Sequence, residues 1–263
     1  MIFSSSLFHK NQLTLDVMLS ILLLSDKYGI EDLRCGITRL LMTHWPLNHS
    51  DYLARQKLYG SGIRVLESMK LIKTAHHCQV AELLPTPFHD VVASQIRDWS
   101  EAEINASRDL SPAILSRLLV GRERSLQRLM NLAVWTNNVI PVLWNPDAVA
   151  TPATILTTRA SWERCTGTSP YGSGTNYCHN GLFPTLETKI GTKLIHGRSA
   201  FNIILILQEE GFPGARVCKP CVDWFMSVLA NKQQEMWENI PVDFDLPRID
   251  SKMYSEHIFS FSN

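Results

Sequence analysis

The sequence predicts a mainly α-helical protein with a helical N-terminal half, a loop-rich C-terminal region and a long C-terminal helix. Apolar residues recur at helical spacing through the first half of the chain. Prolines and glycines gather between residues 135 and 185, and helical spacing returns over residues 218–239. Of the 263 residues, 45% are hydrophobic and 19% are charged, so the chain can bury a sizeable core.

The first two helices are predicted from a cap, a stop and a periodic pattern. Thr14 is a suitable N-cap, Asp16 would lie in the positively polarised first turn, and Gly29 would end the helix. Its buried stripe is expected to comprise Val17, Met18, Ile21, Leu22 and Leu24. A second helix is expected from Ile30 until Trp45-Pro46. We expect the pair to leave some apolar surface uncovered and to pack through Val17, Ile21, Leu24, Leu33, Ile37 and Leu40.

A second helix pair is predicted about fifty residues further on. One helix would run through Val65 and Ile72 to a corner at residues 76–79, and the next would start near Val80, with Pro85 and Pro87 kinking or restarting it. Residues 97–110 are polar and are expected to form a linker or an exposed helix. Ser111 and Pro112 then form an N-cap followed by a proline at the first helical position, which predicts a long helix.

The C-terminal part is predicted to be less regular. Residues 135–185 are expected to form loops with at most short elements, because Pro141, Pro146, Pro152 and Pro170 and several glycines interrupt them. The apolar residues 201–207 could form a buried strand or a helical turn. Residues 218–239 form an amphipathic pattern with Pro220 in its first turn and Ile240-Pro241 after its end, which predicts one helix.

Charge and hydropathy limit the classes of partner that the chain can bind and the compartments in which we expect it. The 25 basic and 25 acidic residues give a formal net charge of zero, so no bulk field draws the chain to nucleic acid. The apolar stretches 21–24 and 203–207 are far shorter than the ~18–20 residues that span a bilayer, so we expect no membrane segment. Six cysteines are too sparse for a disulfide scaffold. We therefore expect an intracellular protein of the cytoplasm or nucleus.

The cysteines provide the most specific chemical signal. Cys218 and Cys221 stand three residues apart at a predicted helix start, and Cys165 and Cys178 lie upstream. Together they form a Cys-x12-Cys-x39-Cys-x2-Cys pattern that could bind a structural zinc ion, with His179 or His196 able to replace Cys178. Two alternatives remain open. The four could be small buried hydrophobes, or Cys218 and Cys221 could be a redox pair.

Other polar groups favour structural roles. The arginines at positions 117, 122, 124 and 128 are typical of a solvated helix face. His76, His77 and His89 have no acid at an interpretable spacing, and the sequence contains no nucleotide-binding, nucleophile-elbow or metalloprotease motif. We therefore predict a protein that is not an enzyme. The rival hypothesis is a thiol-redox or other cysteine-dependent enzyme that uses Cys218 and Cys221.

Six segments of the sequence share motifs with a known protein family. Residues 23–34, LLSDKYGIEDLR, are similar to the helices that close the BTB domain in BTB/POZ domain-containing proteins from mushroom-forming fungi. Residues 80–91, VAELLPTPFHDV, resemble the family's ELLP…FYDL segment, and residues 118–124, LLVGRER, resemble its LLxGRE helix. Residues 217–221, VCKPC, and the later WENIP and FDLP segments at 237–241 and 244–247 are similar to the family's ending.

The resemblance implies a non-enzymatic protein–protein interaction module. Family members begin with a mixed strand-and-helix BTB core, which we expect this chain to lack. Residues 1–46 would be the remnant closing helices of a BTB-like domain, and residues 51–140 a helical domain with helix pairs like those of BACK domains. Residues 141–247 would be a cysteine-containing loop-rich region with a C-terminal helix, and residues 248–263 a tail. The expected partner is an unknown protein, with self-association as a possibility.

Overall fold

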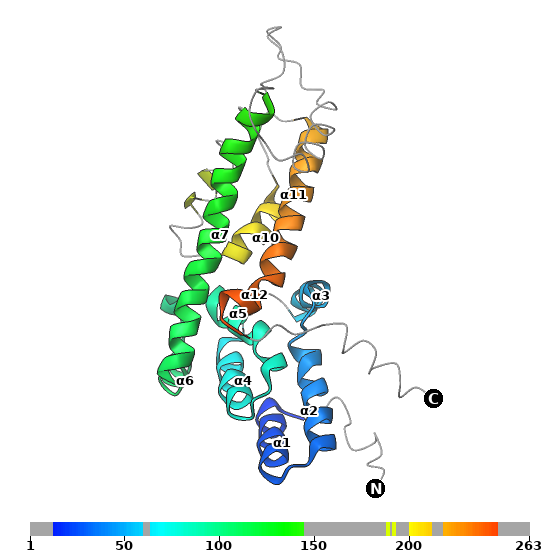
Figure 1. Cartoon of the computed structure of the whole chain (residues 1–263), viewed down its shortest axis with the longest axis vertical. Helices are drawn as coiled ribbons and strands as arrows, with labels where there is room; N and C mark the ends of the chain where they lie inside the picture. The colour runs from blue at the N-terminus through cyan, green and yellow to red at the C-terminus, as the bar shows by residue number, and fades with distance from the viewer. Residues whose placement is uncertain are drawn as a thin grey trace, which may run out of the picture. The chain divides into compact units, whose positions relative to one another are not determined.

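The computed structural model shows a mainly α-helical protein, which confirms the predicted fold class (Figure 1). It describes residues 13–59, 64–144, 188–189, 191–192, 200–211 and 218–246, and no strand occurs among them. The helices are α1 (Leu15–Tyr28), α2 (Glu31–His44), α3 (His49–Tyr59), α4 (Val65–His77), α5 (Pro85–Ala93), α6 (Glu101–Arg108), α7 (Pro112–Trp144), α10 (Ala200–Glu210), α11 (Lys219–Glu238) and α12 (Ile240–Asp243). Two short 3₁₀ helices, η2 (Ala81–Leu83) and η3 (Ile96–Asp98), flank α5.

The chain divides into two compact units. Unit 1 comprises Met1–Gly121 and Ile240–Asn263, and unit 2 comprises Arg122–Asn239. In unit 1, α1 packs on α2 and α4, α4 packs on α5 and α6, and α12 packs on α5. In unit 2, α10 packs on α11. The boundaries predicted from the sequence at residues 46, 140 and 247 stay predictions.

Helix α1 begins and ends at the signals found in the sequence. The Thr14 hydroxyl accepts a hydrogen bond from the Val17 N–H at 3.4 Å, as an N-cap does. Gly29 adopts φ 62°, a left-handed conformation that glycine enters without steric penalty, and its N–H donates to the Asp26 carbonyl. The short link that follows turns the chain directly into α2, where Ile37 and Leu41 are fully buried.

The buried stripe predicted for α1 is partly wrong. Met18, Leu19, Leu22 and Ser25 are buried, whereas Val17 is 44% exposed and Leu24 51% exposed. With about 100° of rotation per residue, the four buried positions share one side of the helix, and Val17 and Leu24 fall on the other. Because α1 is apolar on several sides, its sequence alone does not show which side is buried. The contacts with α2 and α4 determine the buried side.

The second helix pair has the predicted corner, and its proline restarts the helix. Helix α4 ends at His77, and Gln79 adopts φ 55° in the corner. The chain then forms η2, and α5 starts at Pro85, because proline fits the first turn of a helix and not its interior. Residues 85–91 are all buried, so α5 lies at the centre of unit 1.

The exposed helix predicted within residues 97–110 is confirmed as α6, whereas α7 continues past the predicted start of the loop region. Helix α6 is the exposed helix, closed by a capping box between Ser100 and Glu103. Ser111 caps α7, whose Ile114 N–H donates to the Ser111 hydroxyl at 3.4 Å. The loops expected from residue 135 are contradicted as far as residue 144, because α7 continues to Trp144 with Pro141 inside its last turn. Residues 135–140 contain neither glycine nor proline, so nothing stops the helix there.

Unit 2 contains the two helices of the C-terminal region. Residues 201–207 lie within α10, so the helical alternative is the one observed. Helix α11 has Cys218 as its N-cap and Pro220 in its first turn, as predicted. It buries residues at intervals of about four, the pattern of a helix with one apolar face. These residues are Cys221, Phe225, Leu229, Gln233, Met236 and Trp237.

One glycine in unit 1 allows a close ring-to-helix contact. A Cβ atom added to Gly121 would overlap the Phe244 ring, so this ring packs directly on the α7 backbone. Phe244 also contacts Phe88 edge-on, with 5.4 Å between the ring centroids. Both phenylalanines are essentially inaccessible to solvent. The segment after α11 is thereby fixed against α7 and α5 within the unit.

Gly121→Ala is expected to lower the free energy of unfolding, because the Phe244 ring must leave its site. We expect a loss of about 1–2 kcal/mol after allowing for the roughly 1 kcal/mol that alanine adds to helix propensity. Gly36→Ala is the matched control, since Gly36 lies within α2 with no atom near its Cβ position, and it should stabilise. Urea unfolding of both variants checks this. Stabilisation by both would contradict the ring contact.

Candidate functional site

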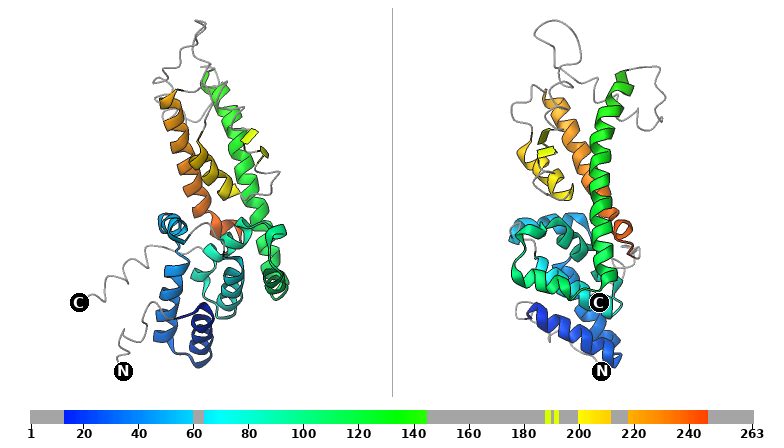
Figure 2. Two further views of the ribbon diagram at one scale, coloured as in Figure 1. Left: turned by 180° about the vertical axis from the view of Figure 1, so that it is seen from behind. Right: turned by 90° about the vertical axis from the view of Figure 1, so that its left-hand side faces the viewer.

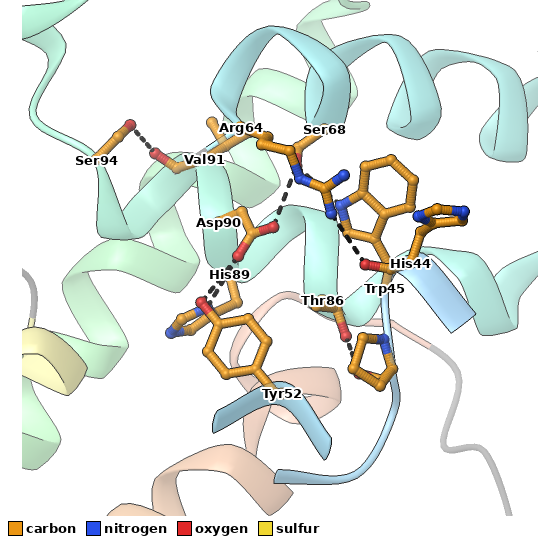
Figure 3. Close-up of polar contacts among 11 residues, drawn as sticks. His44, Trp45, Tyr52, Arg64, Ser68, Thr86, His89, Asp90, Val91 and Ser94 are labelled. Atoms are coloured by element: carbon orange, nitrogen blue, oxygen red, sulfur yellow. Dashed lines mark hydrogen bonds and ion pairs between the residues drawn. The ribbon is translucent and has the colours of Figure 1, made fainter. Parts of the chain in front are cut away.

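A buried carboxylate joins three helices of unit 1. Asp90 on α5 is 8% exposed. Its Oδ1 accepts a hydrogen bond from the Tyr52 hydroxyl of α3 at 3.0 Å, and its Oδ2 accepts one from the Ser68 hydroxyl of α4 at 3.3 Å (Figure 3). A buried carboxylate is tolerated only when such donors replace water. The three side chains therefore hold α3, α4 and α5 in one arrangement.

A second layer of contacts extends this cluster to the end of α2. The Trp45 Nε1–H donates to the Ser68 oxygen at 3.2 Å, so Ser68 both accepts and donates. The Thr86 hydroxyl donates to the Pro46 carbonyl at 2.7 Å. The Arg64 guanidinium covers the Trp45 ring at 4.6 Å from its centroid and donates to the His44 carbonyl at 3.1 Å. Each of these three hydrogen bonds links residues at least twenty positions apart.

The cluster contains a serine, a histidine and an aspartate, but not in the order of a nucleophilic triad. In such a triad the imidazole lies between the hydroxyl and the carboxylate. Here the Ser68 hydroxyl donates directly to Asp90. His89 Nδ1 lies 3.7 Å from Asp90 Oδ1, and the His89 ring meets the Tyr52 ring edge-on at 5.3 Å. This geometry supports a structural role for the cluster.

The predicted metal ligands are only partly described by the structure. Cys218 is half-buried at the N-cap of α11, and Cys221 is buried one turn along, so both lie at the start of one helix. Cys165, Cys178, His179 and His196 lie outside the described residues. Within the described part of the chain, no group of three or more His, Cys, Asp or Glu side chains could hold a metal ion. The four-cysteine zinc site stays a prediction.

Among the residues that the structure describes, exposed large hydrophobic side chains are concentrated on the outer side of α1. Nine large hydrophobic residues are well exposed in the described parts of the chain, and five of them lie between Val17 and Ile30. Val17, Leu24 and Tyr28 are 44%, 51% and 64% exposed and share one face with the half-buried Ile21. We call these four residues the α1 outer stripe. Leu23 and Ile30 flank it at 39% and 43% exposure.

Several contacts hold α1 in a fixed position behind this stripe. Lys70 of α4 donates to Asp16 Oδ1 at 2.8 Å, and Arg34 of α2 lies 4.0 Å from Asp26. Arg34 also donates to the Cys78 carbonyl at 2.9 Å, which ties α2 to the end of α4. With the Thr14 cap and the Gly29 turn, these contacts fix the helix at both ends. The stripe is therefore preformed.

The sequence predicted that the first helix pair leaves apolar surface uncovered, but it did not predict which residues form that surface. Val17 and Leu24 were expected in the contact with α2, and they form the exposed surface instead. Asp90 was missed as a central residue. The available signal was a polar pair, His89-Asp90, between the apolar residues Phe88 and Val91, since a polar group in such a setting needs a buried partner. His76 and His77 are exposed in the last turn of α4.

Comparison with known proteins identifies no relative: no protein family, no characterised protein and no solved structure matches this chain. The resemblance to fungal BTB/POZ proteins therefore stays a prediction. No helix in the described part of the chain is both long and apolar enough to cross a membrane. The assignment of a function consequently depends on the chain's own surface and core.

Tyr52→Phe is expected to destabilise the protein by about 1–3 kcal/mol, because it leaves the buried Asp90 with one donor fewer. Ser68→Ala should do the same, and the double variant should differ from the sum of the two, since both donors serve one carboxylate. Tyr28→Phe is the control at an exposed site, with an expected change within about 0.5 kcal/mol. Urea unfolding measures all four. Additive effects would argue against a shared acceptor.

His44 is expected to make stability depend on pH. Burial, and to a smaller extent the Arg64 guanidinium, lowers the pKa of His44 from its ordinary value of 6.5. The unfolded chain therefore binds this proton more readily than the folded protein, so stability falls as the pH drops below about 6.5. His44→Gln should lose less stability than the wild type between about pH 7.5 and pH 5. Parallel profiles for the wild type and His44→Gln would contradict this account.

Proposed function

We propose that this chain is a protein–protein interaction module and that the α1 outer stripe is its docking surface. The observation that carries the proposal is the gathering of exposed large hydrophobic residues on one helix. Single exposed hydrophobic residues are normal on protein surfaces, whereas contiguous patches mark binding sites. In the rest of the described chain the exposed large hydrophobic residues are spread over four elements: Ile96 in η3, Ile104 in α6, Leu119 in α7 and Val242 in α12.

The rigidity of α1 supports the same proposal. Binding is weakened by the ordering of flexible groups, so a surface on a helix fixed at both ends binds with less entropy loss. Val17 and Leu24 have few rotamers to lose, and the Tyr28 ring offers an apolar face with a polar tip. Tyrosine and large aliphatic side chains are typical anchors of protein interfaces. The likeness to BTB/POZ proteins points to the same class of function.

The thiol-redox alternative involves a different part of the chain. Cys218 at a helix N-cap would have its thiolate favoured by the helix dipole, and Cys221 would be the second thiol. That activity would not depend on α1. A change confined to the α1 outer stripe therefore separates the two hypotheses.

Photo-crosslinking in the native cells tests the proposal. Tyr28→p-benzoylphenylalanine places an aromatic crosslinker on the stripe with little change in shape. Leu119→p-benzoylphenylalanine is the control, because Leu119 is also 64% exposed but lies on α7, outside the stripe. We expect protein adducts from position 28 on irradiation and few from position 119. Equal or absent crosslinking at both positions would overturn the assignment of the docking surface.

A further inference from the structure

We infer that the α1 outer stripe docks against the same stripe of a second copy of this chain, with the two helices antiparallel about a twofold axis. This inference rests on the proposed function and specifies its partner. In Figure 2, α1 lies beside α2 at one edge of unit 1, in dark blue. Its described neighbours are α2 and α4 on the buried side, which leaves the outer side for a partner.

The stripe is complementary to itself in the antiparallel direction. Antiparallel helices pair a residue near one end with a residue near the other end of the partner. With the axis between Ile21 and Leu24, these two residues face each other across the interface, and Val17 faces the partner subunit's Tyr28. Each small side chain then meets a larger one at the outer pair, and two aliphatic chains meet at the inner pair. Such alternation allows close packing.

The charges beside the stripe favour the same direction. Asp16 and Lys27 are eleven residues apart, which is about three helical turns, so they lie on one flank of α1 near its opposite ends. A twofold axis brings Asp16 close to the partner subunit's Lys27, and does so twice. A parallel pair would instead place Asp16 and Lys27 on the flank opposite to their own copies, so that no Asp16–Lys27 contact would form between the subunits. Lys70 contacts Oδ1 of Asp16, and the Asp16 side chain remains 71% exposed.

Ser20 permits the helices to approach. It lies between Asp16 and Leu24 on the exposed side of α1 and has a small side chain. Its hydroxyl donates to the Asp16 carbonyl at 2.8 Å, so the serine needs no water molecule to satisfy its proton. Burying it in an interface therefore leaves no unsatisfied donor. A small residue at this point lets two backbones come close, as in tightly packed helix pairs.

The area that the two α1 helices bury between them sets the expected affinity of the dimer. A helix of 14 residues is about 21 Å long. One such helix pair buries less than the roughly 1,200–2,000 Å² of a stable standard interface. We therefore expect a reversible dimer with a dissociation constant of about 1 μM or weaker.

Sedimentation velocity on the purified full chain, from about 1 μM to about 1 mM, tests the inference. We expect the average mass to rise with concentration from the 29.8 kDa monomer towards twice that value. Leu24→Glu should weaken the dimer by about tenfold or more, because two buried leucines are lost per dimer. Leu119→Glu should leave the dimer unchanged, because Leu119 is 64% exposed, against 51% for Leu24, but lies off the stripe. Circular dichroism confirms that each variant folds.

Lys27→Glu is a second variant that spares the packing of α1, since Lys27 is exposed. It should also weaken the dimer, because it faces the partner subunit's Asp16 with a like charge. A monomer at every concentration, or a dimer that Leu24→Glu and Lys27→Glu leave intact, would overturn the inference. If the purified chain stays monomeric while position 28 crosslinks a different protein in cells, the homodimer is wrong and the α1 outer stripe is still a docking surface. If neither dimerisation nor crosslinking at position 28 is seen, both the homodimer and the docking surface are wrong.

Discussion

The fold of unit 1 depends on the need to satisfy one buried carboxylate. Asp90 lies on α5, the most deeply buried helix, and obtains its donors from α3 and α4. Ser68 donates a hydrogen bond to Asp90 and accepts one from the Trp45 indole N–H, so the residue that follows α2 is linked to the same cluster. Hydrogen bonds are directional, unlike apolar contacts, and a misplaced helix would leave a buried polar group without a partner. The cluster therefore selects one packing of these helices among several that bury similar apolar area.

This arrangement of the core leaves α1 with a single covered side. Helix α4 contacts α5 through one part of its surface and α1 through another, and the exposed Lys70–Asp16 pair also joins α4 to α1. Met18 and Leu22 are buried in the core, and the α1 outer stripe is left on the surface. The stripe is thus a consequence of how the core is closed, on a helix that is too apolar to be a simple solvated surface.

Local signals predicted the helix ends, and tertiary contacts determined the rest. The Thr14 cap, the Gly29 stop, the restart at Pro85 and the Ser111 cap each act within a few residues, so the sequence shows them directly. The inward side of α1 depends on α2 and α4, and both of its sides carry leucine. Asp90 finds Tyr52 and Ser68 at 38 and 22 residues along the chain, and no spacing rule identifies such partners.

Hydrogen–deuterium exchange of the full chain at low and high concentration tests most directly the claim that a fixed core presents α1 for association. Amides of α4 and α5 should exchange slowly at both concentrations, because opening them disrupts the Asp90 cluster. Amides of α1 should exchange more slowly at the higher concentration, since docking opposes local opening. Exchange in α1 that is independent of concentration, together with α5 amides as fast as those of α1, would contradict the account.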